Sequence, residues 1–296
     1  MSTGTVDFVY RGHSRPVWVI GWSPNGYYIA SGGDDRTVQI WDAVTGENIC
    51  TYYGPSSNVQ ALAWSANNTH IVSGYYNGTL DVWDALECKT FLVYRGHSDE
   101  VVAVSCSPDG KYIASGSVDE TVHVWDAANG NHFFSYLGHT DALGGVAWSP
   151  DSTRIASGSY DTTVQIWDPF TGKRISTCHG HTDGVHGVTW SPDGTYIASS
   201  SDDMTVRVWE ATTGTPVHIY GGHKSTVWAV AWSPDGKYIS SGSDDGTVQV
   251  WDAQTVNRKY AYGLTNGWIR SVAWSPNGTA IASGCADGLV RVWQLR

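Results

Sequence analysis

Five segments of the chain contain a histidine, a serine and an aspartate, the side-chain types of a hydrolase catalytic triad, and each segment ends with a tryptophan. The spacing within the set is constant in His13, Ser31, Asp35 and Trp41; His97, Ser115, Asp119 and Trp125; His139, Ser157, Asp161 and Trp167; His181, Ser199, Asp203 and Trp209; and His223, Ser241, Asp245 and Trp251. A monomeric enzyme does not need five copies of one site, so the repetition favours a structural role. The surrounding elements must bring the same four side chains together five times.

A repeat of constant length provides these elements. The tryptophan recurs every 42 residues, at Trp41, Trp83, Trp125, Trp167, Trp209, Trp251 and Trp293. Within each unit, short runs of Val, Ile, Tyr and Trp alternate with turn-forming segments such as SPDG and DDG, which is typical of antiparallel strands. The pattern predicts four strands per unit, no helices and an all-β fold.

The two ends of the chain complement each other. The last unit stops at residue 296 after three predicted strands, whereas residues 5–10 match the fourth strand of the other units. We therefore expect residues 5–10 to pair with the segment 268–296. This pairing closes seven units of 42 residues into a ring without open sheet edges, so we predict a single domain over residues 1–296.

The GH dipeptides, SPDG turns and Trp-Asp dipeptides closely resemble those of the WD-repeat β-propellers, and the chain is similar to the bacterial type of this family. Trp-Asp stands at residues 41–42, 83–84, 125–126, 167–168 and 251–252, and Trp209-Glu210 and Trp293-Gln294 depart from it. The resemblance implies a seven-bladed β-propeller of four-stranded antiparallel blades, closed by the N-terminal strand. Bacterial members often adjoin kinase or nucleotide-switch domains, so this chain could be a receptor module cut from, or independent of, such a protein.

The resemblance also gives the repeated sets a role: a buried hydrogen-bond network from the Trp indole through Ser and His to the turn Asp. Two units lack the complete set. Pro55 and Asn77 replace the His and Asp in the second unit, and Thr265 replaces the His in the seventh. We expect the loops of these two units to be looser than the others, because fewer side chains tie them to the strands.

Composition excludes several classes of protein. The net charge is −11, from 17 Lys and Arg against 28 acidic residues, which disfavours nucleic acid and anionic membranes as partners. The 5 cysteines are scattered and do not form close pairs, so we expect reduced thiols and a cytoplasmic protein. There is no membrane-length apolar run, no cofactor motif is present, and a monomer is expected.

Candidate binding residues are the positions that vary between units while their neighbours stay constant. On the face that carries the GH loops and the Asp turns, here called the GH-loop face, they form a ring around the channel that the resemblance implies. The selected residues are Trp18, Asp34, Tyr76, Tyr160, His186, Asp202, Trp228, Asp244, Trp268 and Arg270. In a closed ring, Trp228, Trp268 and Trp18 form an aromatic arc beside Asp244 and Asp34. Such an arc suits a protein or peptide partner that is basic or carries apolar anchors.

Several alternatives stay open from sequence. The three tryptophans of the arc could simply plug the channel. The channel mouth could belong to a propeller enzyme or a glycan-binding module that uses Asp34, Asp202 and Asp244. The array could also be a regular amplified or designed repeat without an evolved ligand. A metal site at His179, His181 and His186 with Asp183 is disfavoured, because His181 belongs to the repeated network. We favour a non-catalytic protein- or peptide-binding scaffold.

Overall fold

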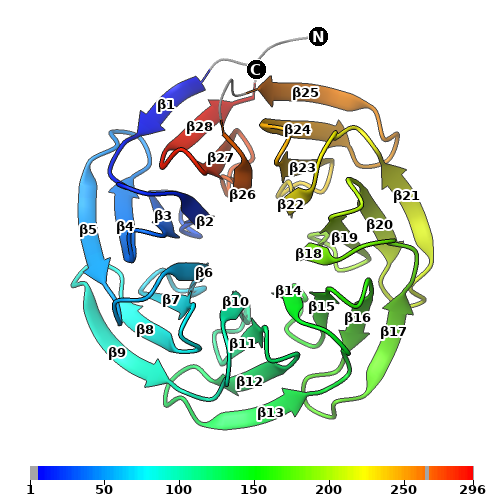
Figure 1. The fold of residues 1–296 in the computed structure, drawn as a ribbon, viewed down its shortest axis with the longest axis horizontal. Helices are drawn as coiled ribbons and strands as arrows, with labels where there is room; N and C mark the ends of the chain where they lie inside the picture. Colours follow the sequence, from blue (N-terminus) through cyan, green and yellow to red (C-terminus); the bar gives the residue numbers. More distant parts are fainter. Residues whose placement is uncertain (1–5, 264–266, 296) are drawn as a thin grey trace.

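The computed structural model describes residues 6–263 and 267–295, and over these residues every regular element is a β-strand. Seven four-stranded antiparallel sheets surround a central channel as the blades of a propeller (Figure 1). The predicted all-β, seven-bladed fold is confirmed. Among the described residues, we find no helix with the length and hydrophobicity needed to span a bilayer.

Each of the first six blades uses four consecutive strands, ordered from the channel outward. Blades 1 and 2 contain β2 (Val17–Trp22), β3 (Tyr28–Gly33), β4 (Thr37–Asp42), β5 (Asn48–Tyr53), β6 (Val59–Trp64), β7 (His70–Tyr75), β8 (Leu80–Asp84) and β9 (Lys89–Tyr94). Blades 3 and 4 contain β10 (Val101–Cys106), β11 (Tyr112–Ser117), β12 (Val122–Asp126), β13 (His132–Tyr136), β14 (Leu143–Trp148), β15 (Ile155–Ser159), β16 (Val164–Trp167) and β17 (Arg174–Cys178). Blades 5 and 6 contain β18 (Val185–Trp190), β19 (Tyr196–Ser201), β20 (Val206–Glu210), β21 (Pro216–Tyr220), β22 (Val227–Trp232), β23 (Tyr238–Ser243), β24 (Thr247–Asp252) and β25 (Arg258–Gly263).

Blade 7 joins the two ends of the chain. It contains β26 (Ile269–Trp274), β27 (Ala280–Cys285) and β28 (Val290–Gln294), and its outer strand is β1 (Val6–Tyr10). The antiparallel register pairs Tyr10 with Val290 and Val9 with Arg291. The predicted closure by the N-terminal strand is therefore confirmed.

The Asp of each Trp-Asp dipeptide caps a turn between the third and fourth strands. Asp42 Oδ1 accepts hydrogen bonds from the backbone N–H groups of Val44 and Thr45, at 2.9 and 2.7 Å. These bonds replace partners that the backbone loses when the chain reverses. The same turn needs a left-handed residue, which is Gly46 at φ 71°.

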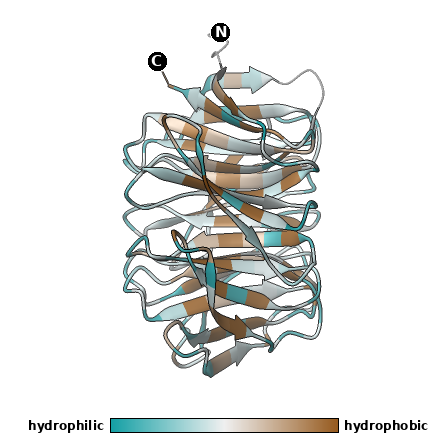
Figure 2. Cartoon of the chain, turned by 90° about the vertical axis from the view of Figure 1, so that its left-hand side faces the viewer, coloured by the Kyte–Doolittle hydropathy of each residue, from teal (hydrophilic) through white to brown (hydrophobic). Residues whose placement is uncertain are grey.

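The tryptophans of the repeat lie between neighbouring blades. Trp41 is fully buried, and Tyr10 of the preceding blade stacks on it with ring centroids 4.8 Å apart. Equivalent stacks join Tyr52 to Trp83 and Tyr136 to Trp167. Figure 2 shows the hydrophobic residues concentrated along the strands, with hydrophilic residues prominent in the turns of the two faces. Burial of these large rings holds each blade against the next one.

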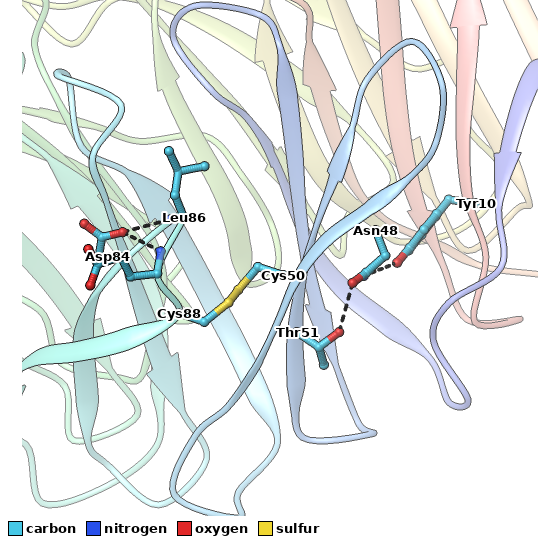
Figure 3. The surroundings of a disulfide bond; sticks show 8 residues. Tyr10, Asn48, Cys50, Thr51, Asp84, Leu86 and Cys88 are labelled. Atoms are coloured by element: carbon cyan, nitrogen blue, oxygen red, sulfur yellow. Dashed lines mark hydrogen bonds between the residues drawn. A yellow bond between two sulfur atoms is a disulfide. The ribbon is translucent and has the colours of Figure 1, made fainter.

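The prediction that all cysteines are reduced thiols was wrong for two of them. Cys50 of β5 and Cys88 form a disulfide bond between blades 1 and 2, with Cα atoms 6.2 Å apart (Figure 3). The pair is 38 residues apart in sequence, so spacing alone did not suggest it. Neighbouring blades bring the outer strand of one against the turn of the next, where Phe8 meets Gly46 and Leu92 meets Gly130 in other blades. Cys106, Cys178 and Cys285 are free.

Candidate functional site

The five histidine sets share one geometry. In each set the His Nδ1 lies 2.7–2.9 Å from the Asp Oδ2 and the His Nε2 lies 2.8 Å from the Ser Oγ. The aspartate belongs to the turn between the second and third strands, and the histidine belongs to the GH loop that precedes the first strand. Each histidine therefore ties a loop and a turn to the serine of the second strand.

The tryptophan end of the network is less uniform. Trp125, Trp167 and Trp209 donate their indole N–H groups to the network serines at 2.8–3.3 Å. The indole nitrogens of Trp41 and Trp251 are buried without a hydrogen-bond partner. Residue types alone do not predict this difference, because the units of Trp41 and Trp251 carry the same four types as the other three.

Burial separates these sets from a working catalytic triad. The five network serines are all 0% exposed, so no substrate carbonyl can reach their hydroxyl groups. Burial raises the pKa of Asp35, but hydrogen bonds from His13 and Thr37 outweigh it and bring the pKa to about 2. The carboxylate is therefore ionised at neutral pH and holds the histidine in place.

The two units without the histidine satisfy their serines differently. In blade 2, Ser73 Oγ lies 2.7 Å from the hydroxyl of Tyr75 and accepts the indole N–H of Trp83 at 3.1 Å. In blade 7, Ser283 accepts the indole N–H of Trp293 at 3.0 Å. Thr265 lies outside the described residues.

The predicted aromatic arc exists, but a cation of the same chain occupies it. The Arg270 guanidinium carbon lies 3.9 Å from the centre of the Trp228 ring and 4.9 Å from those of Trp18 and Trp268. Its Nη2 is 3.6 Å from Asp244 Oδ1, and its side chain is only 8% exposed. From residue types alone we expected a partner to supply the positive charge at this position, whereas Arg270 of β26 supplies it from within the chain. A cation held between aromatic faces is stabilised by their quadrupoles.

A second group of rings continues from the arc along the channel wall. The His186 ring lies 4.0 Å from Trp228 and 5.2 Å from Tyr160, between centroids. His186 Nε2 is 2.9 Å from Asp202 Oδ1. Burial lowers the pKa of His186, and the carboxylate of Asp202 opposes this shift only in part. His186 is largely buried but lines the cavity of the central channel, so its role in binding stays a prediction.

Other members of the predicted ring link neighbouring blades. Asp34 Oδ1 accepts a hydrogen bond from Asn58 at 2.8 Å, and Asp202 Oδ1 accepts one from Thr226 at 3.0 Å. These bonds form because the turn after the second strand of one blade lies next to the start of the first strand of the next blade. Their variation between units therefore reflects blade contacts in part, which sequence alone could not distinguish from ligand contacts.

Three of the aromatic residues in the predicted ring are exposed. Trp268 is 52% exposed, Tyr76 60% and Tyr160 39%. Tyr160 lines a central cavity of 570 Å³ together with Trp18, Trp228 and Arg270, among others. The exposed Trp268 lies next to this lining, with its ring centre 4.9 Å from the Arg270 guanidinium carbon. Glu100 also lines this cavity, and its pKa is raised by burial and by Asp99. Glu100 occupies the same repeat position as Trp268, which was the available sequence signal for it.

The three histidines of the disfavoured metal site do not share a common centre. His181 pairs with Asp203 and His186 with Asp202, while His179 is exposed. Over residues 6–263 and 267–295, no group of three or more His, Cys, Asp or Glu side chains is arranged to hold a metal ion.

Comparison with known proteins agrees with the fold. A family model described as "WD domain, G-beta repeat" matches residues 4–42, 46–84, 88–126, 130–168, 172–210, 214–252 and 259–294. A segment of 45 residues is 49% identical to a "Ribosome biogenesis protein BOP1 homolog" of Drosophila virilis, and covers 15% of this chain and 6% of that protein. Over the same length and coverage, the identity is 47% to the homolog of Drosophila melanogaster and 44% to "Ribosome biogenesis protein ERB1" of Ajellomyces capsulatus.

These relatives are eukaryotic, so the comparisons support the repeat family and not the bacterial type. The aligned segment spans only 6% of the length of each of these relatives. The seven matched repeats cover most of the sequence. The chain therefore belongs to the WD40 repeat family.

Proposed function

We propose that this propeller is a non-catalytic scaffold that binds a protein or peptide on the GH-loop face, around the mouth of the central channel. The observation that carries the proposal is Trp268, which is 52% exposed beside a buried, fixed cluster of rings and charge. A large apolar side chain at the rim of a rigid cavity loses little conformational entropy on binding, so it can serve as an anchor.

The occupied arc narrows the chemistry of the partner. A basic side chain would have to displace Arg270 from Trp18 and Trp228, whereas an apolar or aromatic side chain can pack on the exposed part of Trp268 without disturbing that cluster. We therefore favour an apolar anchor over a basic one. The plug interpretation fits Trp18 and Trp228, which are half-buried, and does not fit Trp268.

Two observations support a role without catalysis. The repeated Ser, His and Asp groups are inaccessible to substrate, since their serines are fully buried. The relatives are named for ribosome biogenesis, which supports a role in a larger assembly, but only one short segment is shared. The alternative enzyme or glycan module would use Asp34, Asp202 and Asp244, and these carboxylates are instead paired with Asn58, Thr226 and Arg270.

We also propose that the protein is a cytoplasmic monomer with bacterial-type repeats, supported by the acidic balance and the constant repeat length. The Cys50–Cys88 disulfide bears against the cytoplasmic part of this proposal, because such bonds persist mainly in oxidising compartments. The redox state of these two cysteines in cells tests it directly.

A random peptide library displayed on phage tests the binding proposal. Peptides selected on the wild-type protein should contain an apolar or aromatic anchor and should bind Trp268→Ala at least about tenfold more weakly. Tyr27→Ala is the matched control, because Tyr27 is 68% exposed and lies in the turn between β2 and β3, away from the GH-loop face. Equal binding to wild type and Trp268→Ala would contradict the proposed site.

A further inference from the structure

The opposite face of the propeller carries the SPDG turns and is here called the SPDG-turn face. Near it, the first strand of six blades ends in a tryptophan, at positions 22, 64, 148, 190, 232 and 274. The indole of Trp64 donates to the carbonyl of Gly21, and that of Trp190 to the carbonyl of Ala147, both at 3.1 Å. Each of these side chains therefore fills the junction with the preceding blade.

At three of these junctions, the preceding blade also covers the indole with a side chain of its own. Tyr112 stacks on Trp148, with ring centroids 6.2 Å apart, and Tyr238 stacks on Trp274 at 6.5 Å. In blade 4 the covering residue is Arg154, whose guanidinium carbon lies 4.6 Å from the Trp190 ring. At these three junctions, a bicyclic ring and a covering group from the preceding blade occupy the space together.

Blade 3 lacks the ring. Its first strand ends in Cys106, which takes the place of the tryptophan in the cluster between blades 2 and 3. The junction is partly refilled from the other side, because Val72 stands where five of the other units have a buried alanine, at Ala30, Ala114, Ala156, Ala198 and Ala282. The two additional methyl groups of valine are much smaller than the missing indole, so part of the space at this junction stays unfilled.

The remaining space is a cavity of 240 Å³, lined by Val72, Val82, Ile113, Cys106 and Tyr112, among others. Burial raises the pKa of the Cys106 thiol to about 12, so this side chain is neutral at physiological pH. The part of the cavity wall that Val72, Val82 and Ile113 form is apolar. Apolar cavities of about 150 Å³ are known to stay dry and to bind benzene-sized molecules.

The covering residue is still present at the empty junction. His70 of blade 2 occupies the same repeat position as Tyr112 and Arg154, and it lines the cavity. Its ring lies 5.3 Å from that of Phe91, which also lines the cavity and is 56% exposed. A planar ring entering from solvent would therefore meet an aromatic face on the side where the other blades cover their indoles.

We propose that this cavity between blades 2 and 3 is a binding site for a small planar aromatic molecule of one or two fused rings, the size of the indole that the other blades supply. The gain on binding comes from contacts that the cavity walls lack when it is empty and from burial of the apolar ring. The site is independent of the proposed peptide site, which lies on the other face.

Free indole is the probe, with binding measured by calorimetry or by saturation-transfer NMR on the full chain. We expect one site per chain. Cys106→Trp restores the missing ring and should weaken indole binding at least about tenfold, while Cys106→Ser keeps the space and should bind about as the wild type does. Trp268→Ala should leave indole binding unchanged, although it should abolish peptide binding, so failure of one proposal is distinct from failure of the other.

Two further variants cover the case in which Cys106→Trp does not fold. Cys106→Met fills part of the cavity with a flexible side chain and should weaken indole binding several-fold. Trp190→Cys should open an equivalent cavity beneath Arg154 and raise the stoichiometry from one site to two. The proposal is overturned if indole does not bind the wild type, if filling position 106 leaves the affinity unchanged, or if the wild-type signal vanishes in Trp268→Ala and persists in Cys106→Trp.

Discussion

Blades 2 and 4 solve the same packing problem with different side chains. In blade 4, His139 links Ser157 to Asp161, with contacts of 2.8 and 2.7 Å. In blade 2, Tyr75 takes the place of the histidine at the serine, 2.7 Å from Ser73. Both tyrosine and histidine are buried. The requirement that the two blades share is a partner for the buried serine, and either a phenol or an imidazole meets it.

The two solutions differ in what they connect. His139 and Asp161 are 22 residues apart and tie the GH loop to the turn after the second strand. Tyr75 and Ser73 belong to the same strand, two residues apart, so their bond connects no loop. Blade 2 instead has the disulfide to blade 1 on its outer side. A hydrogen-bonded histidine and aspartate therefore stabilise blade 4, whereas a covalent link and a buried phenol stabilise blade 2.

Removing the disulfide should have the largest effect on this comparison. The bond closes a segment of 38 residues, so we expect Cys50→Ser with Cys88→Ser to lower the free energy of unfolding by about 3 kcal/mol. Blade 2 should lose its protection from hydrogen exchange before blade 4 does. Urea denaturation with hydrogen-exchange mass spectrometry measures both, and Cys285→Ser is the control for a free, buried thiol. Simultaneous loss of protection in both blades would show that the disulfide does not set their difference.

The disulfide is also a feature of the structure that the sequence does not predict. The strands and the ring closure follow from the constant spacing of tryptophan and turns, because a repeated unit must bury its apolar face against identical neighbours. Contacts between neighbouring units do not follow from it. Cys50 and Cys88 occupy different positions of their units, and only the packing of adjacent blades brings them together.

The candidate site shows the same limit. Variation between units selected Trp268 and Arg270 as candidates, but it could not show that Arg270 turns back onto Trp228. The direction of a long side chain depends on the neighbouring blade. Cys106 stands where the other six units have tryptophan, but only the packing of blades 2 and 3 shows that the missing ring leaves space.

The next largest effect tests the network of blade 4. His139→Ala leaves Ser157 and Asp161 buried without the histidine, so we expect a loss of about 2 kcal/mol in the free energy of unfolding. Tyr75→Phe is the counterpart in blade 2, and it should cost about 1 kcal/mol, because the hydroxyl contacts with Ser73 and Asp81 are lost while the ring stays and Ser73 keeps the indole N–H of Trp83. Chemical denaturation gives both values. His179→Ala, at an exposed histidine outside the networks, should be neutral. A larger loss for Tyr75→Phe than for His139→Ala would reverse the comparison.

The two blades should also respond to pH with opposite sign. Burial raises the pKa of Asp161, but hydrogen bonds from His139 and Thr163 outweigh it and hold the pKa below the usual 3.8. The unfolded chain therefore binds the proton first, and this contribution to stability is present above pH 3.8 and is lost as the pH falls toward the folded pKa. Burial raises the pKa of Asp81 above 3.8, against hydrogen bonds from Tyr52 and Tyr75. Its ionisation opposes folding as the pH rises through that raised value.

Amide variants separate these two contributions. Asp161→Asn should destabilise the protein at pH 7 and should reduce the loss of stability on acidification. Asp81→Asn should be neutral or stabilising at pH 7, by about 1 kcal/mol at most, and this difference should vanish near pH 3. Melting temperatures at pH 3, 5 and 7 measure both. Parallel pH profiles for the two variants would show that the carboxylates do not differ in the way their surroundings indicate.

The smallest effect concerns motion of the loops. The turn of blade 4 is tied to its GH loop by His139 and by the backbone N–H of Thr140, which donates to Asp161 at 3.2 Å. In blade 2 the backbone N–H of Asn77 donates to Ser57 Oγ at 3.1 Å, and no histidine joins the loop to the turn, since Pro55 stands in its place. We therefore expect amides near Asn77 to exchange several-fold faster than those near Asp161, which corresponds to an opening free energy lower by about 1 kcal/mol.

Asn77→Asp tests whether the missing carboxylate is the cause of faster exchange. Without a histidine in the loop, where Pro55 stands, the new carboxylate has no cation to hold, so exchange near residue 77 should stay fast. Pro55→His combined with Asn77→Asp restores both residue types of the network. Because the Tyr75 hydroxyl already bonds Ser73, the restored histidine must compete with it for the serine. Slow exchange should therefore return only when Tyr75→Gly is added, since blade 1 has Gly33 at this repeat position. Slow exchange in Asn77→Asp alone would show that the turn residue, and not the link between loop and turn, sets the local stability.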